Sequence, residues 1–159
     1  VPLSIAASIA LMVGIFWPGK TMNDGGAFAM MHYQEYMPNF SNSRGEATTS
    51  EEAANLLISG QAAEAEQLIL NSDNPNRYLL AHSLMMQEKY GEALVQFEFC
   101  LASDSYAQDQ KAASEFYMAL CYFGQEEVEK GKSQLGVIRQ DAEHPFTVLA
   151  EKLYQSWEE

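Results

Sequence analysis

One pattern constrains the fold of this chain more than any other. In three segments with helical periodicity, a small residue is followed four positions later by a large apolar one. The pairs are Ala65 with Ile69, Ala93 with Phe97, and Gly131 with Leu135. A small side chain lets two helix backbones approach each other, and a large one fills the space beside the contact. The pattern therefore predicts helical hairpins stacked side by side, because each hairpin needs its neighbours to bury its apolar face.

Start and stop signals divide the chain from Thr49 onward into helices. Thr49 with Glu52, and Ser105 with Gln108, match the capping box, and Asn74 followed by Pro75 is typical of a helix start. No alternating strand pattern longer than four residues occurs, so we expect an all-α fold. The expected helices cover residues 49–59, which end at Gly60, then 61–71, 74–89, 91–102, 105–123, 125–140 and 144–157.

These segments resemble tetratricopeptide repeats (TPR). The residues that carry the resemblance are Gly60, Ala65 and Ile69, then Tyr90-Gly91-Glu92-Ala93 and Phe97, then Phe116, Met118-Ala119, Tyr122, Gly131 and Leu135. The small residues lie 28 and 38 positions apart, against a family period of about 34, and the first repeat lacks its opening aromatic. The resemblance implies a short TPR-like α-solenoid over residues 49–143 and a capping helix over residues 144–159. Another array of helical hairpins is the alternative.

The resemblance also implies a binding surface. TPR proteins hold a partner on a concave face lined by the first helix of each pair. The matching positions here are Tyr78, His82, Met85, Met86, Phe116, Leu120 and Phe123. Such an apolar groove, rich in methionine and aromatic residues, suits a protein or peptide partner that presents a helix or an extended apolar segment. The alternative is that the same side chains form core, because apolar stripes at helical spacing usually do.

The first residues favour a membrane anchor. Residues 1–17 carry no charged side chain and as a helix would span about 25 Å. Trp17, Pro18 and Lys20 are typical of the point where a helix leaves the bilayer. We therefore expect residues 1–18 to form a single transmembrane helix, with the acidic repeat domain in the periplasm of a bacterium. A cleaved secretory signal and a buried core helix are the alternatives.

Residues 19–48 form a linker and docking segment between the anchor and the repeats. Residues 21–26 are polar, end in two glycines and predict a flexible joint. Tyr33, Tyr36 and Phe40 follow, and because these aromatic side chains need burial, we expect residues 28–40 to pack against the helical array in cis. The stretch from His32 to Asn39 is similar to a group of single-span bacterial envelope proteins often encoded beside alternative sigma factors. That resemblance implies an envelope or signalling role.

Composition and spacing argue against several other functions. The chain has 22 acidic and 9 basic residues and a net charge of −13, which disfavours binding to nucleic acid. His32, His82 and His144 have no ligand at helical spacing, so we expect no metal, no cofactor and no enzymatic activity. Cys100 and Cys121 are expected to be buried thiols, with a single disulfide as the alternative.

The sequence thus predicts a membrane-anchored protein–protein interaction module. Its partner would be a protein or peptide segment bound on the concave surface, and residues 1–18 would contact the lipid bilayer. A single-span regulator of transmembrane signalling linked to a sigma factor is the alternative function.

Overall fold

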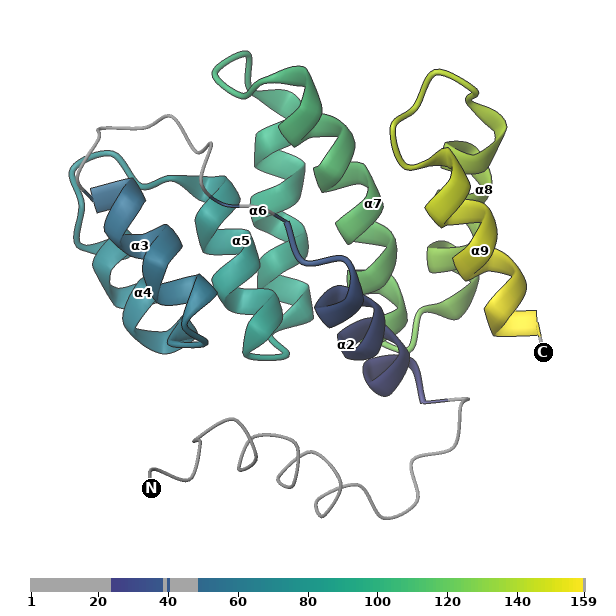
Figure 1. The fold of residues 1–159 in the computed structure, drawn as a ribbon, viewed down its shortest axis with the longest axis horizontal. Helices are drawn as coiled ribbons and strands as arrows, with labels where there is room; N and C mark the ends of the chain where they lie inside the picture. Colours follow the sequence, from purple (N-terminus) through teal and green to yellow (C-terminus); the bar gives the residue numbers. More distant parts are fainter. Residues whose placement is uncertain (1–23, 39, 41–48, 159) are drawn as a thin grey trace, which may run out of the picture.

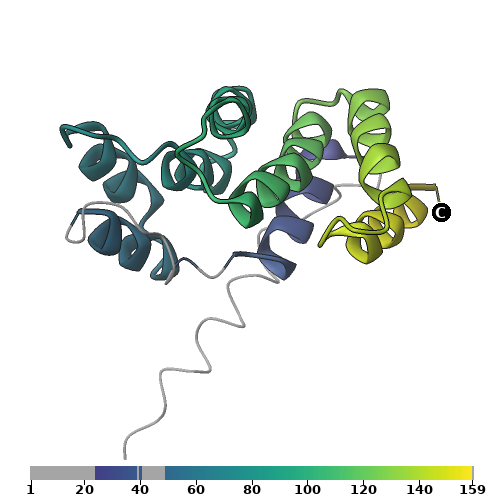
Figure 2. The same ribbon diagram turned by 90° about the horizontal axis from the view of Figure 1, so that it is seen from above.

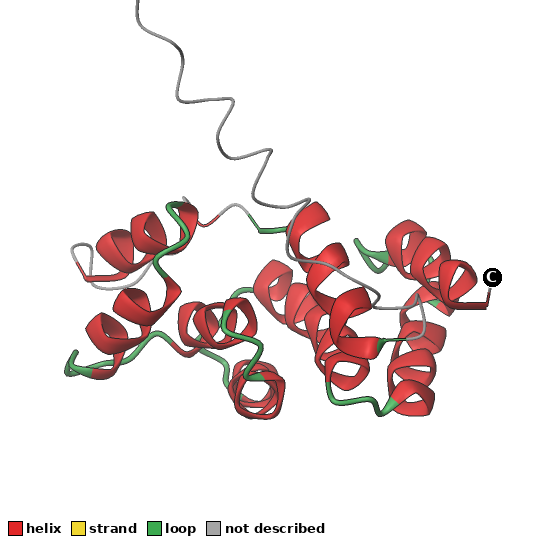
Figure 3. Cartoon of the chain, turned by 90° about the horizontal axis from the view of Figure 1, so that it is seen from below, coloured by secondary structure: helices red, strands yellow, loops and turns green. Residues whose placement is uncertain are grey.

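A computed structural model describes residues 24–38, 40 and 49–158, and its secondary structure in these ranges is entirely helical (Figures 1 and 3). The expected all-α fold is therefore confirmed for this part of the chain. The helices are α2 (Gly25–Glu35), α3 (Thr49–Ile58), α4 (Ala62–Leu70), α5 (Arg77–Met86), α6 (Tyr90–Ala102), α7 (Gln108–Gly124), α8 (Val128–Gln140) and α9 (Thr147–Glu158).

The helices from α3 onward form consecutive antiparallel neighbours. Each helix packs on the next, and the first helices of successive pairs also touch, as α3 does with α5 and α5 with α7. Seen from above, α3, α5, α7 and α9 make one row, and α4, α6 and α8 make the other (Figure 2). Helix α2 does not belong to either row. It lies against the first row, between α7 and α9 in the view of Figure 2, and packs mainly on α7.

The three hairpins share one turn. Gly60, Glu88 and Glu126 each have a positive φ, of 78°, 58° and 63°. In each turn two backbone N–H groups bond back to carbonyls of the preceding helix, as Glu88 N does to Met85 O at 2.9 Å and Lys89 N to Leu84 O at 2.9 Å. This is the Schellman arrangement, in which a left-handed residue ends a helix and satisfies its last carbonyls. These turns recur 28 and 38 residues apart, the same spacing as the small residues of the sequence pattern.

The small residues lie where the pattern places them. Ala65, Ala93 and Gly131 are all buried, five positions after the left-handed residue of their hairpin. A Cβ atom on Gly131 would come within 2.8 Å of the Phe123 ring of α7, so a side chain at this position of α8 would displace that ring. The large partners Ile69, Phe97 and Leu135 are also buried. The predicted close approach of two helices is confirmed at Gly131, and Ala65 and Ala93 are buried as the pattern requires.

Four helix starts were predicted three residues too early, at 74, 105, 125 and 144, because α5, α7, α8 and α9 begin at Arg77, Gln108, Val128 and Thr147. Helix α5 is capped by Asn76, whose side chain accepts from Leu79 N at 3.2 Å, and not by Asn74. Starting there leaves the Arg77 N–H free to donate to the Tyr106 hydroxyl at 3.0 Å, which satisfies a donor in the first turn. Helix α7 begins after Ala107 and not at Ser105, and the Gln110 side chain accepts from Ala107 N at 3.2 Å.

Helix α2 begins inside the expected flexible joint. Asp24 is its N-cap, and the carboxylate accepts from Ala27 N at 3.0 Å. Gly25 and Gly26 are therefore helical residues, which corrects the sequence prediction of a joint over residues 21–26. No helix within residues 24–38 and 49–158 is long and apolar enough to cross a membrane. The transmembrane helix expected over residues 1–18 lies outside the described residues.

Candidate functional site

The sequence places its candidate partner-binding residues on two helices of one row. Helix α5 carries Tyr78, His82, Met85 and Met86, and helix α7 carries Phe116, Leu120 and Phe123. The structure buries all of these side chains except Met86, which is half-buried. They therefore do not line an open groove, and three of them, His82, Phe116 and Phe123, lie against another part of the same chain.

Helix α2 is what covers this surface. Phe28, Ala29, Tyr33 and Phe40 are each 5% exposed or less, and α2 packs along α7 (Figure 1). The prediction that residues 28–40 pack against the array in cis is confirmed for the residues of this range that the structure describes. We call the surface of α5, α7 and α9 under α2 the α2 groove.

Three aromatic rings join the start of α2 to helices α7 and α9 of the array. The Phe28 ring lies 4.8 Å from the Phe123 ring of α7 and 4.9 Å from the Trp157 ring of α9, and the last two lie 4.9 Å apart. Such clusters stabilise a contact beyond the area that they bury. Phe28 therefore holds α2 against two helices of the array at once.

Tyrosine hydroxyls of the array hold the backbone of α2 near each of its ends. The Tyr90 hydroxyl donates to Gly26 O at 3.2 Å, and the Tyr117 hydroxyl donates to Tyr36 O at 2.6 Å. Burial raises the pKa of both tyrosines, so both hydroxyls keep the proton that they donate. Because both acceptors are backbone carbonyls, these two hydrogen bonds fix where a helix lies but do not discriminate between its side chains.

Gly25 lies at a close approach between α2 and the backbone of α7. A Cβ atom at this position would lie 2.0 Å from the carbonyl oxygen of Phe123, at the end of α7. Because that oxygen belongs to a helix backbone, it cannot move aside as the tip of a flexible side chain could. The groove therefore accepts only glycine at this point of the bound helix.

His82 lies at the centre of the groove inside a ring of aromatic side chains. The ring centroids of its neighbours are 4.5 to 5.8 Å from its own. The neighbours are Tyr33 and Phe40 from the docking segment, Tyr78 from α5, Phe97 from α6 and Tyr117 from α7. His82 Nδ1 pairs with the Tyr33 hydroxyl at 3.2 Å. Burial lowers the pKa of His82 to about 3, so the imidazole is neutral at physiological pH.

The carboxyl end of α2 is joined to α9 by exposed polar contacts. Lys152 Nζ donates to Glu35 Oε1 at 2.9 Å and to the Tyr36 hydroxyl at 2.7 Å. Hydrogen bonds from Lys152 and then from Tyr36 lower the pKa of Glu35 to about 2. These groups are accessible to water, so they fix the orientation of α2 more than they stabilise it.

Sequence reasoning identified the groove but missed the residues that hold its occupant. His82, Phe116 and Phe123 do contact the docking segment, through Tyr33, Tyr36 and Phe28 respectively. Tyr90, Tyr117 and Gly25 were not predicted as site residues. A signal existed for Gly25, because paired glycines directly before an aromatic-rich stretch indicate a close backbone approach as well as a joint. No sequence signal identified the hydroxyls of Tyr90 and Tyr117, because their partners are backbone atoms distant in sequence.

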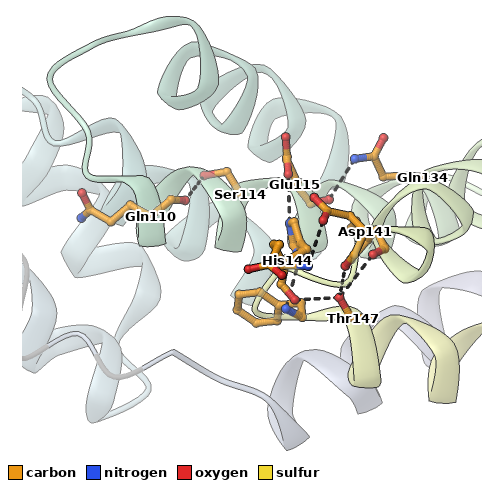
Figure 4. A network of polar contacts seen from close by, with 10 residues as sticks. Gln110, Ser114, Glu115, Gln134, Asp141, His144 and Thr147 are labelled. Atoms are coloured by element: carbon orange, nitrogen blue, oxygen red, sulfur yellow. Dashed lines mark hydrogen bonds and ion pairs between the residues drawn. The ribbon is translucent and has the colours of Figure 1, made fainter.

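His144 belongs to a structural network at the start of α9 (Figure 4). His144 Nε2 pairs with Glu115 Oε2 of α7 at 3.0 Å, and His144 Nδ1 accepts from Phe146 N at 3.1 Å. The Thr147 hydroxyl donates to the carbonyls of Asp141 and His144. This hydroxyl is committed to backbone carbonyls that precede the helix, so the network joins the α8–α9 turn to α7 and has no free nucleophile.

Other chemistry finds no support among the described residues. They contain no group of three His, Cys, Asp or Glu side chains placed to hold a metal ion. Cys100 and Cys121 are free and buried, and burial raises the pKa of Cys100 to about 12. The disulfide between Cys100 and Cys121, which the sequence left as an alternative, is therefore absent, and neither thiol is a reactive nucleophile.

A surface pocket of about 310 Å³ lies between the starts of α3 and α5, with Arg77, Phe99 and Tyr106 in its wall. The Arg77 guanidinium already bonds to Gln96 and lies over the Phe99 ring. The α2 groove is thus the site that the structure defines best. Comparison with family models, with curated proteins and with solved structures finds no match to this chain.

Proposed function

We propose that this chain is a membrane-anchored protein–protein interaction module that binds a helical partner segment in the α2 groove of a TPR-like array. One observation carries the proposal: the groove already holds a helix that belongs to neither row of the array, through three aromatic contacts and hydrogen bonds at both ends. A surface that positions one helix by contacts to its backbone can position another of similar shape. The partner helix takes the place of α2.

The chemistry of α2 describes the partner. It would need a glycine at its start, an aromatic residue three positions later and a small residue after that, as in Gly25, Phe28 and Ala29. A tyrosine at the position of Tyr33 would reach His82. Binding of this kind requires no catalytic group and no cofactor, in keeping with a module that is not an enzyme.

Anchoring through residues 1–18 places the array at a bilayer, on the periplasmic side in a bacterium. Because α2 begins at Gly25, residues 19–24 link the proposed anchor to the docked helix and can extend over at most about 20 Å. The array would therefore be held close to the membrane while α2 is docked, and could move away when α2 is released. This coupling supports the second candidate, a single-span regulator of transmembrane signalling linked to a sigma factor.

A synthetic peptide of residues 24–40 tests the binding function. The receptor is the full chain with Phe28→Ala and Tyr33→Ala, which weakens its own α2 and leaves the groove intact. We expect fluorescence anisotropy to show binding to this receptor, and at least roughly tenfold weaker binding to the unchanged chain, because a tethered helix competes at high effective concentration.

The matched control is the same peptide with Gly25→Ala, which should not bind because its Cβ would meet the Phe123 carbonyl. Retained protection of the Cys100 thiol verifies that the double variant is folded. If the released receptor binds neither peptide, or binds both equally, the groove is not a helix-binding site.

Vesicles test the signalling candidate. A fluorophore on the exposed Val148 of the anchored chain, paired with acceptor lipids, reports the distance of the array from the bilayer. Energy transfer should fall when enough unmodified peptide to displace α2 is added to the chain with its native α2, and it should already be lower in the double variant. Unchanged transfer on binding would leave the interaction module without a signalling role.

A further inference from the structure

Two buried polar atoms in the described part of the chain have no hydrogen-bond partner, and both belong to the α2 groove. They are Nε2 of His82, on the array, and Nε2 of His32, on α2. A buried polar atom without a partner destabilises the state that contains it. Here that state is the closed one, with α2 docked, and the two histidines lie on opposite sides of the same interface.

The groups that face His82 offer no charge to balance an imidazolium. Its titratable neighbours are Tyr33 from α2, Tyr78 from its own helix α5 and Tyr117 from α7, while α6 contributes only the Phe97 ring. Burial raises the pKa of all three tyrosines, so they are neutral. No carboxylate lies against this ring among the described contacts, and a protonated His82 would be an unpaired buried charge.

His32 has a more mixed environment. Glu35, on the same helix, lies 3.2 Å from Nδ1 and raises its pKa, whereas burial and Lys152 from α9 lower it. The Phe28 ring meets its ring in an edge-on contact at 4.4 Å, and the Tyr36 ring lies parallel to it at 6.2 Å. Burial is the largest of these effects, so the pKa of His32 lies below its ordinary value of 6.5. Glu35 is also bound to Lys152, which limits its ability to stabilise an imidazolium.

We propose that His82, with a contribution from His32, makes the docking of α2 sensitive to acid, so that the groove opens below neutral pH. When α2 leaves, His82 loses Tyr33, Phe40 and the partner of its Nδ1, and that nitrogen meets water. The open state can therefore be protonated where the closed state cannot. Acid release of α2 involves this chain alone and can be measured without a partner. The further step, in which the opened groove admits a partner helix, rests on the proposed function.

The direction and size of the pH effect on α2 docking follow from proton linkage. The closed-state pKa of His82 is about 3, and an exposed imidazole titrates near 6.5. The contribution of neutral His82 to the stability of the closed state is therefore fully present above pH 6.5. That contribution is lost as the pH falls from 6.5 toward 3. Between pH 7.5 and 5.5 the opening equilibrium should rise by up to about tenfold through His82 alone. His32 acts in the same direction.

Thiol labelling of the full chain measures this opening. Ala29, on α2, is fully buried, whereas Met31, on the same helix, is 52% exposed. The labelling rate of an Ala29→Cys chain divided by that of a Met31→Cys chain reports the open fraction, because the pH dependence of thiol reactivity cancels. Native Cys100 is fully buried on α6, next to Tyr106 and Ser114, so its labelling reports unfolding of the array. Hydrogen exchange of the α2 amides, corrected for intrinsic rates, gives the same quantity without a new cysteine.

The ratio should rise by up to about tenfold from pH 7.5 to 5.5 while Cys100 stays protected. His82→Asn keeps an acceptor near the Nδ1 position but cannot titrate, and it should remove most of the rise; His32→Asn should remove less. A ratio independent of pH, a rise that persists in His82→Asn, or labelling of Cys100 in parallel would overturn the proposal. None of these results depends on peptide binding, so failure of the acid release and failure of the binding function are separate outcomes.

Discussion

The hydroxyl of Tyr117 donates a 2.6 Å hydrogen bond to the carbonyl of Tyr36, 81 residues earlier in the chain. Tyr36 is the residue directly after α2, where helix carbonyls have no partner within their own helix. A side chain of α7 therefore completes the end of α2, and the docked helix depends on the array for part of its own hydrogen bonding.

Removing this hydroxyl should weaken the docking of α2. Tyr117→Phe keeps the buried ring but leaves the Tyr36 carbonyl without its partner, so we expect the free energy of unfolding to fall by about 1 kcal/mol. Urea denaturation followed by circular dichroism measures the change. Tyr122→Phe is the matched control, since it removes a hydroxyl from the same helix on the side that faces Lys130 of α8. Equal losses in both variants would contradict a specific role for the Tyr117 hydroxyl.

Two glycine-to-alanine changes should act in opposite directions. Within a helix, alanine is favoured over glycine by about 1 kcal/mol. Gly136 of α8 has no atom within 4 Å of an added Cβ, so Gly136→Ala should stabilise the chain by about that amount. Gly25→Ala places a Cβ 2.0 Å from the Phe123 carbonyl and should destabilise the docking of α2 instead. Thermal unfolding of the two variants tests the pair, and stabilisation by Gly25→Ala would mean that α2 does not approach α7 this closely.

Glycine substitutions in the hairpin turns should increase the free energy of unfolding. Glu88 and Glu126 adopt the left-handed conformation that costs a residue with a Cβ about 1 kcal/mol or more. Glu88→Gly and Glu126→Gly should each raise the free energy of unfolding by about 0.5 to 1 kcal/mol, after the extra entropy of glycine in the unfolded chain is subtracted. Gly60→Ala, at the equivalent turn, should lower it. A loss of stability in both glutamate variants would show that their side chains matter more than the backbone conformation.

The native thiols should be unreactive until the chain unfolds. Cys100 and Cys121 are buried, and burial raises the pKa of both, to about 12 for Cys100. At pH 8 almost no thiolate is present, so a thiol reagent should modify neither residue in the native chain. In denaturant without reductant it should modify both, because no disulfide joins them. One thiol or none in denaturant would instead indicate oxidation.

Helical architecture could be predicted from sequence because its determinants are local. Helix periodicity and a small residue four positions before a large one depend on neighbours within one or two turns. The pairs at Ala65, Ala93 and Gly131 therefore marked the helix contacts correctly. The need to bury Tyr33 and Phe40 likewise indicated a docking segment, since exposed aromatic side chains are unfavourable wherever the chain places them.

The state of the groove was decided only by tertiary structure. Tyr78, His82 and Phe116 have the same local pattern whether they line an open surface or lie under another helix. His82 and Phe116 lie against the docking segment, through Tyr33 and Tyr36, and Tyr33 meets His82 across 49 residues of sequence. The exposure of a side chain, the pKa of His82 and the requirement for glycine at position 25 are properties of contacts between distant segments. Local sequence preferences contain no information about such contacts, because either arrangement satisfies them equally well.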